Sequence, residues 1–502
     1  MGYEAPPELN IADYFLFDRL ADGARDRVAI RTDAGPVTYH EVAALAAGYA
    51  RELVAMVVRP EQRVLIAMSD GLDYAAALFG ILRIGAVGVM INPEQQLAHL
   101  AAIVEAARAP VAIVDDSYAD VLAAAAVTSP VPLRLLVAGT VRPAEVVGRS
   151  FPTHRDDPAI WLFSGGTTGL PKIVPQTHRS FANTTERYGK ATIGYGPEDI
   201  TIAVPRLYFG YATGSNLFFP FSVGASTVLF AARPTPAVLF AQIARHRPTI
   251  LVTAPSAINA MLSDPNAATA DLSSLRLATS AGEALPESLY HRWKARFGVE
   301  LIDGLGTAEM WHIFITNRPG DVKPGTVGRV VSGFEIKACD EEGNEVGVGE
   351  VGRLWVRGAS RAPGYWHDLE QTSTAFRGEW FVGGDLISVD GEGYVTHRGR
   401  ADDALKVKGQ WLRPQEVESA LLEHPAVKEC AVVAVEDIDG LLKPVAFVVA
   451  AQAVEEAELQ SHVLARLEPY KHPRRVLFVE SLPQTHLGKV DRGALKRMVD
   501  QQ

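Results

Sequence analysis

Short apolar runs alternate with longer Ala-rich stretches over the first three quarters of the chain. In one such unit, an apolar run at 63–68 precedes helical spacing at 73–84 and a second apolar run at 86–91. Helical spacing is also clear at 39–54 and 288–297. Further runs typical of buried strands lie at 111–114, 160–163, 200–204, 227–230, 250–253 and 299–302. This alternation predicts an α/β fold.

The pattern changes at about residue 325. Gly-punctuated segments such as 352–358 and 393–397 predict a β-rich subdomain with antiparallel strands. Beyond about residue 400 the chain predicts a compact α+β unit, with helices at 414–423 and 455–467 and strands at 429–435, 445–450 and 476–479. We therefore expect a large multi-layer domain with α/β sheets over 1–400 and a small, mobile α+β domain over 401–502.

Composition narrows the functional classes. The 502 residues exceed what one hydrophobic core usually supports, and 48% hydrophobic with 21% charged residues is ordinary for a globular protein. The 48 basic and 59 acidic residues give a net charge of −11, and no basic run is present. Nucleic acid is therefore not an expected partner.

The number of cysteines and the length of the apolar stretches indicate the cellular compartment in which the protein is expected. Cys339 and Cys430 lie far apart, so we expect neither a disulfide framework nor a cysteine-rich metal site. This favours a reducing, cytoplasmic setting. Arg83 interrupts the longest apolar stretch, around 75–90, so no membrane association is expected.

A Gly- and hydroxyl-rich segment directly follows the predicted strand 160–163. Glycines let backbone N–H groups approach an anion, hydroxyls add donors, and a lysine adds charge. The residues that would form this phosphate-binding loop are Ser164, Gly165, Gly166, Thr167, Thr168, Gly169 and Lys172. A polar surface turn is the alternative, but the order of these residues after an apolar strand favours the anion loop.

The spacing in this segment differs from that of the common nucleotide loop. Gly165 is followed five residues later by Leu170, and Lys172 is followed by Ile173 rather than by a hydroxyl residue. ATP binding is therefore expected, but phosphoryl transfer by an ordinary P-loop kinase is not.

Further motifs occur downstream in a fixed order. They are Gly-Leu-Gly-Thr-Ala-Glu at 304–309, Gly-Gly-Asp at 383–385, Gly-Arg-Ala-Asp-Asp at 399–403 and Pro-Gln-Thr-His-Leu-Gly-Lys at 483–489. Together with the loop, they resemble the acyl-adenylate-forming enzymes, which include acyl- and aryl-CoA ligases, peptide-synthetase adenylation domains and luciferases. The resemblance runs from about residue 160 to the end of the chain.

Other segments narrow the resemblance. Those at 280–286, 309–314 and 317–321 are most similar to benzoate–CoA ligases, whereas the loop itself is closer to dihydroxybenzoate-adenylating enzymes. Both groups activate aromatic carboxylates. The resemblance implies an AMP-forming acid–thiol ligase that uses ATP, Mg²⁺ and CoA and forms an aryl-AMP intermediate.

Several alternatives stay open at the level of sequence. The acyl group could pass to an acyl-carrier protein instead of CoA, or the acid could be an amino-, hydroxy- or halo-benzoate. A non-catalytic acid-sensing protein on this fold is a different class, and it is disfavoured by the intact motif residues. A homodimer is open as well.

The resemblance also implies a nucleotide site. The loop would hold the β- and γ-phosphates, Glu309 would bind Mg²⁺, and Asp385 would accept hydrogen bonds from the ribose hydroxyls with Arg400 nearby. Ala308 stands where most relatives have a Thr that contacts the α-phosphate, so Thr307 or backbone N–H groups would compensate. The residues expected around the adenine are Gly282, Glu283, Ala284, Asp303, Gly304, Leu305 and Gly306.

Three further roles fall on the C-terminal quarter. By resemblance, Lys489 would reach the substrate carboxylate and neutralise charge that grows in the transition state. Asp402 matches a hinge about which the small domain would turn between the two half-reactions. The second orientation would bring Gly409 to the pantetheine tunnel, where a side chain would crowd a thin ligand.

The segment 205–214 falls where the superfamily builds its acyl pocket. The residues expected to line a flat slot for one ring are Tyr208, Phe209, Gly210, Tyr211, Ala281, Gly304, His312 and Ile313. Taken alone, such aromatics are more often part of a core. The segment offers no carboxylate for an amino-acid ammonium group, and Tyr208-Phe209 replace the His-Asn of dihydroxybenzoate enzymes, which favours benzoate-like acids.

Two positions bear on ring substituents. Gly210 stands where benzoate ligases usually have Ala, and we expect a methyl-sized space there that admits an amino, hydroxyl or halogen group. His312 is expected either to bond to that group or to form a wall of the pocket.

Overall fold

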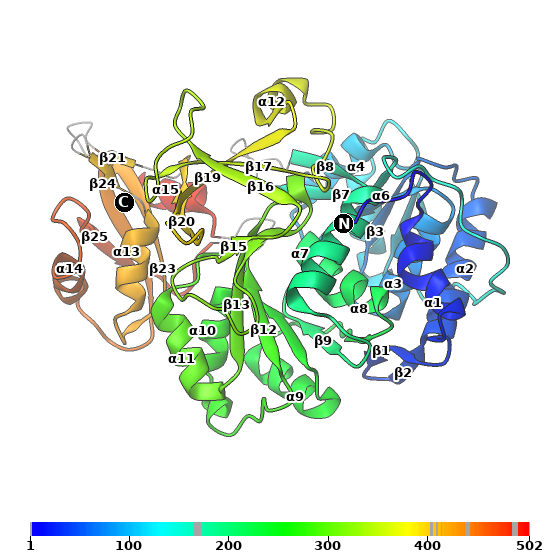
Figure 1. Ribbon diagram of the computed structural model, residues 1–502, viewed down its shortest axis with the longest axis horizontal. Helices are drawn as coiled ribbons and strands as arrows, with labels where there is room; N and C mark the ends of the chain where they lie inside the picture. Colours follow the sequence, from blue (N-terminus) through cyan, green and yellow to red (C-terminus); the bar gives the residue numbers. More distant parts are fainter. Residues whose placement is uncertain are drawn as a thin grey trace.

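The computed structural model describes residues 3–164, 172–401, 405–407, 410–412, 414–436, 442–483 and 490–500. It confirms an α/β architecture with a large N-terminal part built from several sheets and a smaller C-terminal part (Figure 1). No helix among these residues has the length and apolar character needed to cross a bilayer.

The first sheet has the order β6-β5-β3-β4-β7-β8 and is parallel except for the last pair. Its strands are β3 (Arg63–Ala67), β4 (Val87–Met90), β5 (Val111–Val114), β6 (Arg134–Val137), β7 (Pro158–Ser164) and β8 (Lys172–Thr177). Its helices are α2 (Tyr39–Ala55), α3 (Leu72–Arg83), α4 (Leu97–Ala107) and α5 (Ala119–Ala125). Alternate residues of β3 face α2 and α3 on one side and α4 and α5 on the other, so the strand is buried on both faces.

The second sheet has the order β15-β14-β13-β12-β11-β9-β10-β1-β2. Its strands are β1 (Val28–Thr32), β2 (Gly35–Thr38), β9 (Ile200–Ala203), β10 (Ser226–Val228), β11 (Ile250–Thr253), β12 (Leu277–Ala281), β13 (Glu300–Gly306), β14 (Ile313–Thr316) and β15 (Arg329–Val330). One face packs against α9 (Pro236–His246), α10 (Pro255–Ser263) and α11 (Glu287–Phe297). The other face contributes to the same core as the first sheet.

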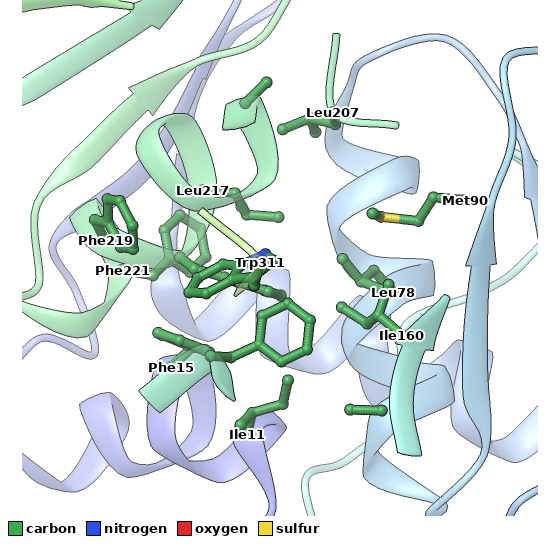
Figure 2. Close-up of a cluster of buried hydrophobic side chains, with 14 of the residues drawn as sticks. Ile11, Phe15, Leu78, Met90, Ile160, Leu207, Leu217, Phe219, Phe221 and Trp311 are labelled. Atoms are coloured by element: carbon green, nitrogen blue, oxygen red, sulfur yellow. The ribbon is translucent and has the colours of Figure 1, made fainter. Parts of the chain in front are cut away.

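Short helical segments fill the space between these two sheets. They are η1 (Asp13–Phe17), α1 (Asp18–Ala21), α6 (His178–Thr184), η3 (Thr185–Ile193), α7 (Gly210–Thr213), η4 (Gly214–Phe218) and α8 (Phe219–Ser222), where η1, η3 and η4 are π-helical. Figure 2 shows the aromatic core that they form around Trp311, with Phe15, Phe219 and Phe221 on one side and Leu78 and Ile160 on the other.

The β-rich part is antiparallel, as predicted. It consists of β16 (Phe334–Cys339), β17 (Gly352–Gly358), α12 (Leu369–Ala375), β18 (Phe376–Arg377), β19 (Trp380–Val389) and β20 (Val395–Arg400). It lies at the top of the view in Figure 1, above the second sheet.

The C-terminal elements lie at the left end of Figure 1 and have their own hydrophobic clusters. They are β21 (Leu405–Val407), β22 (Gln410–Leu412), α13 (Pro414–Leu422), β23 (Val427–Glu436), β24 (Leu442–Ala450), α14 (Glu456–Leu464), β25 (Arg475–Phe478) and α15 (Arg492–Asp500). The predicted order of helices and strands is confirmed here. One contact with the large part is a hydrogen bond in which the Asn259 side-chain amide donates to the Lys428 carbonyl at 2.8 Å.

Among the strands that extend further than the sequence predicts, β13 and β20 carry predicted site residues in their extensions. β13 continues to Gly306 because Gly304 pairs with Ala281 on β12 and Leu305 pairs with Ile315 on β14. β20 continues to Arg400, which pairs with Asp385 on β19. In both places, backbone pairing with neighbouring strands keeps a Gly-containing segment extended.

Candidate active site

The hairpin β7–β8 closes the predicted phosphate loop at its base. Ser164 at the end of β7 lies opposite Lys172 at the start of β8. The Ser164 hydroxyl is buried and has no hydrogen-bond partner among the described residues. The predicted site residues that lie outside the described residues are Gly165, Gly166, Thr167, Thr168, Gly169, Asp402, Gly409 and Lys489.

Glu309 lies in a short 3₁₀ turn, η6 (Ala308–Met310), that follows β13. The Thr307 hydroxyl begins this turn by accepting a hydrogen bond from the Met310 N–H at 3.3 Å, so its own hydrogen is still available to a ligand. Glu309 is only 6% exposed, and its Oε1 accepts a hydrogen bond from the Tyr365 hydroxyl at 2.8 Å. The Lys172 ammonium lies 5.1 Å from the centroid of the Tyr365 ring.

The surroundings of Glu309 are suited to a metal only in part. Oε2 has no hydrogen bond or ion pair within the described ranges. No cluster of three or more His, Cys, Asp or Glu side chains able to hold a metal occurs in that part of the chain either. A Mg²⁺ ion at Glu309 would therefore take most of its ligands from phosphate oxygens and water, as Mg²⁺ commonly does with nucleotides.

Asp385 lies across the β19–β20 pair from Arg400, whose guanidinium is 3.9 Å from Oδ1. The same oxygen is 3.1 Å from Nε2 of His397, a residue that the sequence did not single out. Asp385 is 8% exposed. Its carboxylate is held by two neighbours on β20, His397 and Arg400.

The predicted adenine residues follow the ends of the adjacent strands β12 and β13. Gly282 has a φ of +91°, a conformation that favours glycine. The Glu283 carboxylate accepts two hydrogen bonds from Ser256 in the first turn of α10. The Ser256 N–H donates at 2.9 Å and the Ser256 hydroxyl donates at 3.0 Å. Asp303 is buried, and this burial raises its pKa to about 8. Ala284 and Leu305 lie in the same two strand-end segments.

The residues predicted to line the acid pocket lie where α7 meets the segment after η6. The Tyr211 ring lies 5.2 Å from the His312 ring, and the Tyr211 hydroxyl donates to Thr279 of β12 at 2.8 Å. A methyl group on Gly304 would lie 3.0 Å from Cγ2 of Ile313, so these two residues are in contact. Ala281 lies beside Gly304 on β12. These predicted pocket residues are therefore close together.

His312 is neutral and has a defined tautomer. Its Nε2 lies 3.1 Å from the Tyr211 carbonyl oxygen and 3.2 Å from the Ser215 hydroxyl. Because a carbonyl only accepts, Nε2 carries the proton, and Nδ1 is then an acceptor. Burial lowers the pKa of His312 to about 3. Nδ1 is buried and has no partner in the described part of the structure.

The space predicted at Gly210 is bordered by Leu162 of β7 and by the Trp311 backbone. A methyl group on Gly210 would lie 3.1 Å from Cδ1 and 3.4 Å from Cδ2 of Leu162, with the Trp311 carbonyl oxygen at 3.5 Å. A side chain at Gly210 would therefore require a small shift of Leu162, and room for a ring substituent beside Gly210 stays a prediction. The Trp311 ring is 2% exposed and packs against Phe181 in the core.

Tyr208 and Phe209 precede α7 and contact each other, with ring centroids 4.6 Å apart. Their segment is anchored by Asp70, whose Oδ1 accepts a hydrogen bond from the Leu207 N–H at 3.0 Å. Burial raises the pKa of Asp70 to about 6. Both rings are partly exposed, which is suited to a mouth of the pocket rather than its floor.

Several contacts could not be found by scanning for motifs. His397 and Tyr365 each bond to a motif carboxylate, but they come from other strands or loops. The Gly-Tyr pair at 364–365 beside a Gly-punctuated strand was the available signal for Tyr365, and nothing in the sequence distinguished it from core packing.

Comparison with known proteins accounts for this arrangement. The family model of AMP-binding enzymes matches residues 17–366, and the model of their C-terminal domain matches residues 416–489. Benzoate–CoA ligase of Thauera aromatica is 38% identical over 508 residues, covering 98% of this chain and 96% of that enzyme.

Solved structures agree with the sequence comparison. An anthranilate CoA ligase in complex with anthranoyl-AMP superimposes with a TM-score of 0.93 at 36% identity, over 98% of both chains. A benzoate CoA ligase from Burkholderia xenovorans LB400 superimposes with a TM-score of 0.89 at 36% identity, over 97% of this chain and all of that one (100%). The nucleotide-site motifs, the fold and these relatives agree, and the chain belongs to the AMP-binding enzyme family.

Proposed function

We propose that the chain is an ATP-dependent aryl-CoA ligase that activates a benzoate-type carboxylate as an aryl-AMP and transfers it to CoA. The observation that carries this proposal is that one strand, β13, serves both sites. Gly304 contacts Ile313 in the acid pocket, and the same strand leads three residues later to Thr307 and then to Glu309. A ring held in the pocket would have its carboxylate directed at the nucleotide site.

The chemistry follows from the poor reactivity of a carboxylate. A carboxylate oxygen attacks the α-phosphorus of ATP, and pyrophosphate leaves with the electron pair of the broken P–O bond. The CoA thiolate then attacks the carbonyl carbon of the mixed anhydride, and AMP leaves. Charge develops in the transition state of each step. A protein accelerates the step by holding hydrogen-bond donors in fixed positions around that charge.

Each group of site residues has a part in this reaction. Ser164 and Lys172 would contact the departing phosphates together with the loop residues between them, and Asp385 would accept hydrogen bonds from the ribose hydroxyls. Thr307 would donate its free hydroxyl hydrogen to the α-phosphate. Glu309 would hold Mg²⁺, which supplies charge neutralisation on the phosphate oxygens.

The proposal divides the chain into a large domain over 1–400 and a small domain over 401–502. The motif residues of the small domain, Lys489, Asp402 and Gly409, would act in acyl-AMP formation, domain rotation and thioester formation respectively. Their support comes from the sequence motifs and from the match to the C-terminal family model.

The buried, unpartnered Nδ1 of His312 favours a more specific substrate. An acceptor of this kind is satisfied by an N–H or O–H group on the ring, as in an amino- or hydroxybenzoate, and is left unsatisfied by unsubstituted benzoate. The similarity to an anthranilate CoA ligase also supports an amino substituent.

Pyrophosphate release across a panel of acids tests the proposal. The panel contains benzoate, its amino- and hydroxy-derivatives, and a long-chain fatty acid, each with and without CoA. We expect release with aromatic acids and aryl-CoA formation when CoA is present. Maximal release with the fatty acid would exclude the aromatic assignment, and product formation only with a phosphopantetheinylated carrier protein would exclude CoA as the acceptor.

A further inference from the structure

The segment between β17 and α12 joins the two halves of the nucleotide site. Its Ala362 N–H donates to the Glu309 carbonyl at 2.8 Å, and its Trp366 N–H donates to the carbonyl of Ile173, the residue after Lys172, at 2.9 Å. The backbone of Tyr365 lies between these two anchors and donates to the Thr372 hydroxyl at 2.9 Å. Tyr365 is therefore fixed with respect to both Glu309 and β8.

The Tyr365 side chain makes one contact through its hydroxyl and another through the face of its ring. Its hydroxyl donates to Oε1 of Glu309 at 2.8 Å, and its ring face lies 5.1 Å from the Lys172 ammonium. A hydrogen bond of this kind fixes the rotation of a carboxylate, and a cation over a ring face is attracted by the ring quadrupole. The ring thus lies between a cation and an anion.

Lys172 and Glu309 form no ion pair with each other or with any other residue in the described ranges. This separation is unusual for a mostly buried carboxylate with a lysine nearby, because direct pairing would neutralise both groups. Such pairing would also consume the charge that each needs for a phosphate or a metal. Since Lys172 contacts the Tyr365 ring and Glu309 contacts the Tyr365 hydroxyl, both charges stay available.

We propose that Tyr365 is a positioning residue that orients Glu309, with Oε1 held and Oε2 open toward a divalent cation, and that keeps Lys172 from pairing with Glu309. The inference rests on the proposed function, since it assumes that the site binds ATP with a metal. Tyr365 would not touch the reacting atoms itself.

Two variants separate the two contacts. Tyr365→Phe removes only the hydroxyl, whereas Tyr365→Leu also removes the ring that separates the charges. Tyr394→Phe is a matched control away from the site, because the Tyr394 hydroxyl donates to Asp321 at 2.6 Å and the Lys323 ammonium lies 4.6 Å from its ring.

The measurement is equilibrium binding to the full-length protein without any acid. Binding of ATP is followed by calorimetry with and without Mg²⁺, and binding of Mn²⁺ in the presence of ATP is followed by electron paramagnetic resonance. For Tyr365→Phe we expect metal affinity in the presence of ATP to fall by about tenfold, the scale of one hydrogen bond to a charged group. Binding of metal-free ATP should stay within about twofold of wild type, because the ring and Lys172 are unchanged.

For Tyr365→Leu we expect metal-free ATP to bind more weakly as well, because Lys172 is free to pair with Glu309. Adding Glu309→Gln to the Leu variant should restore binding of metal-free ATP. Adding Glu309→Gln to the Phe variant should give the same metal affinity as Glu309→Gln alone. This dependence on Glu309 separates positioning from a general loss of structure.

Other results overturn the inference. The inference is overturned if Tyr365→Phe keeps the metal affinity of wild type, or if it loses no more metal affinity than Tyr394→Phe does. It is also overturned if the losses of metal affinity in Tyr365→Phe and Glu309→Gln are additive. A wild-type protein that binds no ATP under any condition would instead contradict the proposed function. The two failures are therefore distinguishable.

Discussion

His312 shows how the acid pocket depends on residues that do not face the substrate. A methyl group on Gly214, at the start of η4, would lie 2.5 Å from Cδ2 and 2.7 Å from Nε2 of His312. The imidazole has little room to withdraw, because Phe219 packs with its ring centroid 4.8 Å away. The absence of a side chain at Gly214 therefore sets the orientation of the imidazole.

Gly214→Ala should lower kcat/KM for the acid and leave kcat/KM for ATP almost unchanged. Displacing a pocket wall by a fraction of an ångström is expected to lower kcat/KM for the acid by about 10- to 100-fold. Pyrophosphate release with each substrate varied in turn measures both effects. Gly391→Ala, where an added methyl meets nothing within 4 Å, is the control. Equal changes for the acid and ATP would contradict a local effect on His312.

His178 predicts a dependence of stability on pH. It is 1% exposed, its Nδ1 accepts from the Ile11 N–H at 3.1 Å, and burial lowers its pKa to about 3. Between the unfolded pKa of about 6.5 and the folded value, only the unfolded chain binds the proton, so the free energy of unfolding falls as pH falls.

His178→Asn keeps an acceptor for Ile11 but cannot titrate. We expect the free energy of unfolding of wild type, relative to this variant, to decrease by about 2 kcal/mol between pH 6.5 and pH 5. Urea denaturation of both proteins across this range measures the difference. Parallel pH curves would mean that His178 is not buried in its neutral form.

At the scale of elements, α2 depends on a capping box. The Thr38 hydroxyl accepts from the Glu41 N–H at 3.3 Å, and the Glu41 carboxylate accepts from the Thr38 N–H at 2.7 Å. Thr38→Ala should lower the free energy of unfolding by about 1 kcal/mol without changing activity, and Thr38→Ser should recover most of the loss. Thermal and urea unfolding of the three proteins test this, and equal losses in both variants would argue against the cap.

The elements also show what the sequence could predict. Periodicity predicted β5 and β11 with the bounds observed, because buried parallel strands are continuous apolar runs. It stopped β13 too early, because Gly304 and Gly306 are kept extended by pairing with neighbouring strands rather than by their own preference. It did not predict the π-helical turns at all, since a one-residue shift in hydrogen bonding barely alters the spacing of apolar residues.

The candidate site was predicted to a different extent in each part. Motifs predicted nucleotide-site roles for Glu309 and Asp385, and these roles stay predictions. The structure adds the neighbours of the two carboxylates, Tyr365 and His397. The motifs did not predict Tyr365, because it lies 56 residues from Glu309 along the chain, or His397, because only the pairing of β19 with β20 brings it beside Asp385. The contact between Gly210 and Leu162 was not predicted either, since only the fold brings Leu162 against Gly210.

At the scale of the whole molecule, the two half-reactions must share one site. Under the proposed function, the small domain would turn relative to the large one at Asp402, within the sequence motif at 399–403. Asp402→Pro, which restricts backbone rotation, should leave aryl-AMP formation within about threefold of wild type and lower thioester formation by about tenfold or more. Pyrophosphate release and aryl-CoA formation, measured separately, test this. Equal losses in both steps would contradict a hinge at Asp402.

Trp311 links the acid pocket to the centre of the molecule. Its φ of +65° turns the ring into the aromatic core, while its carbonyl oxygen faces Gly210. The ring lies 6.3 Å from that of Phe218, which stacks on Phe15 near the N-terminus at 4.3 Å. Selection for new acids in the laboratory should therefore recover substitutions in this core, far from any substrate atom. Libraries restricted to pocket-lining positions would miss a route by which this scaffold can diversify.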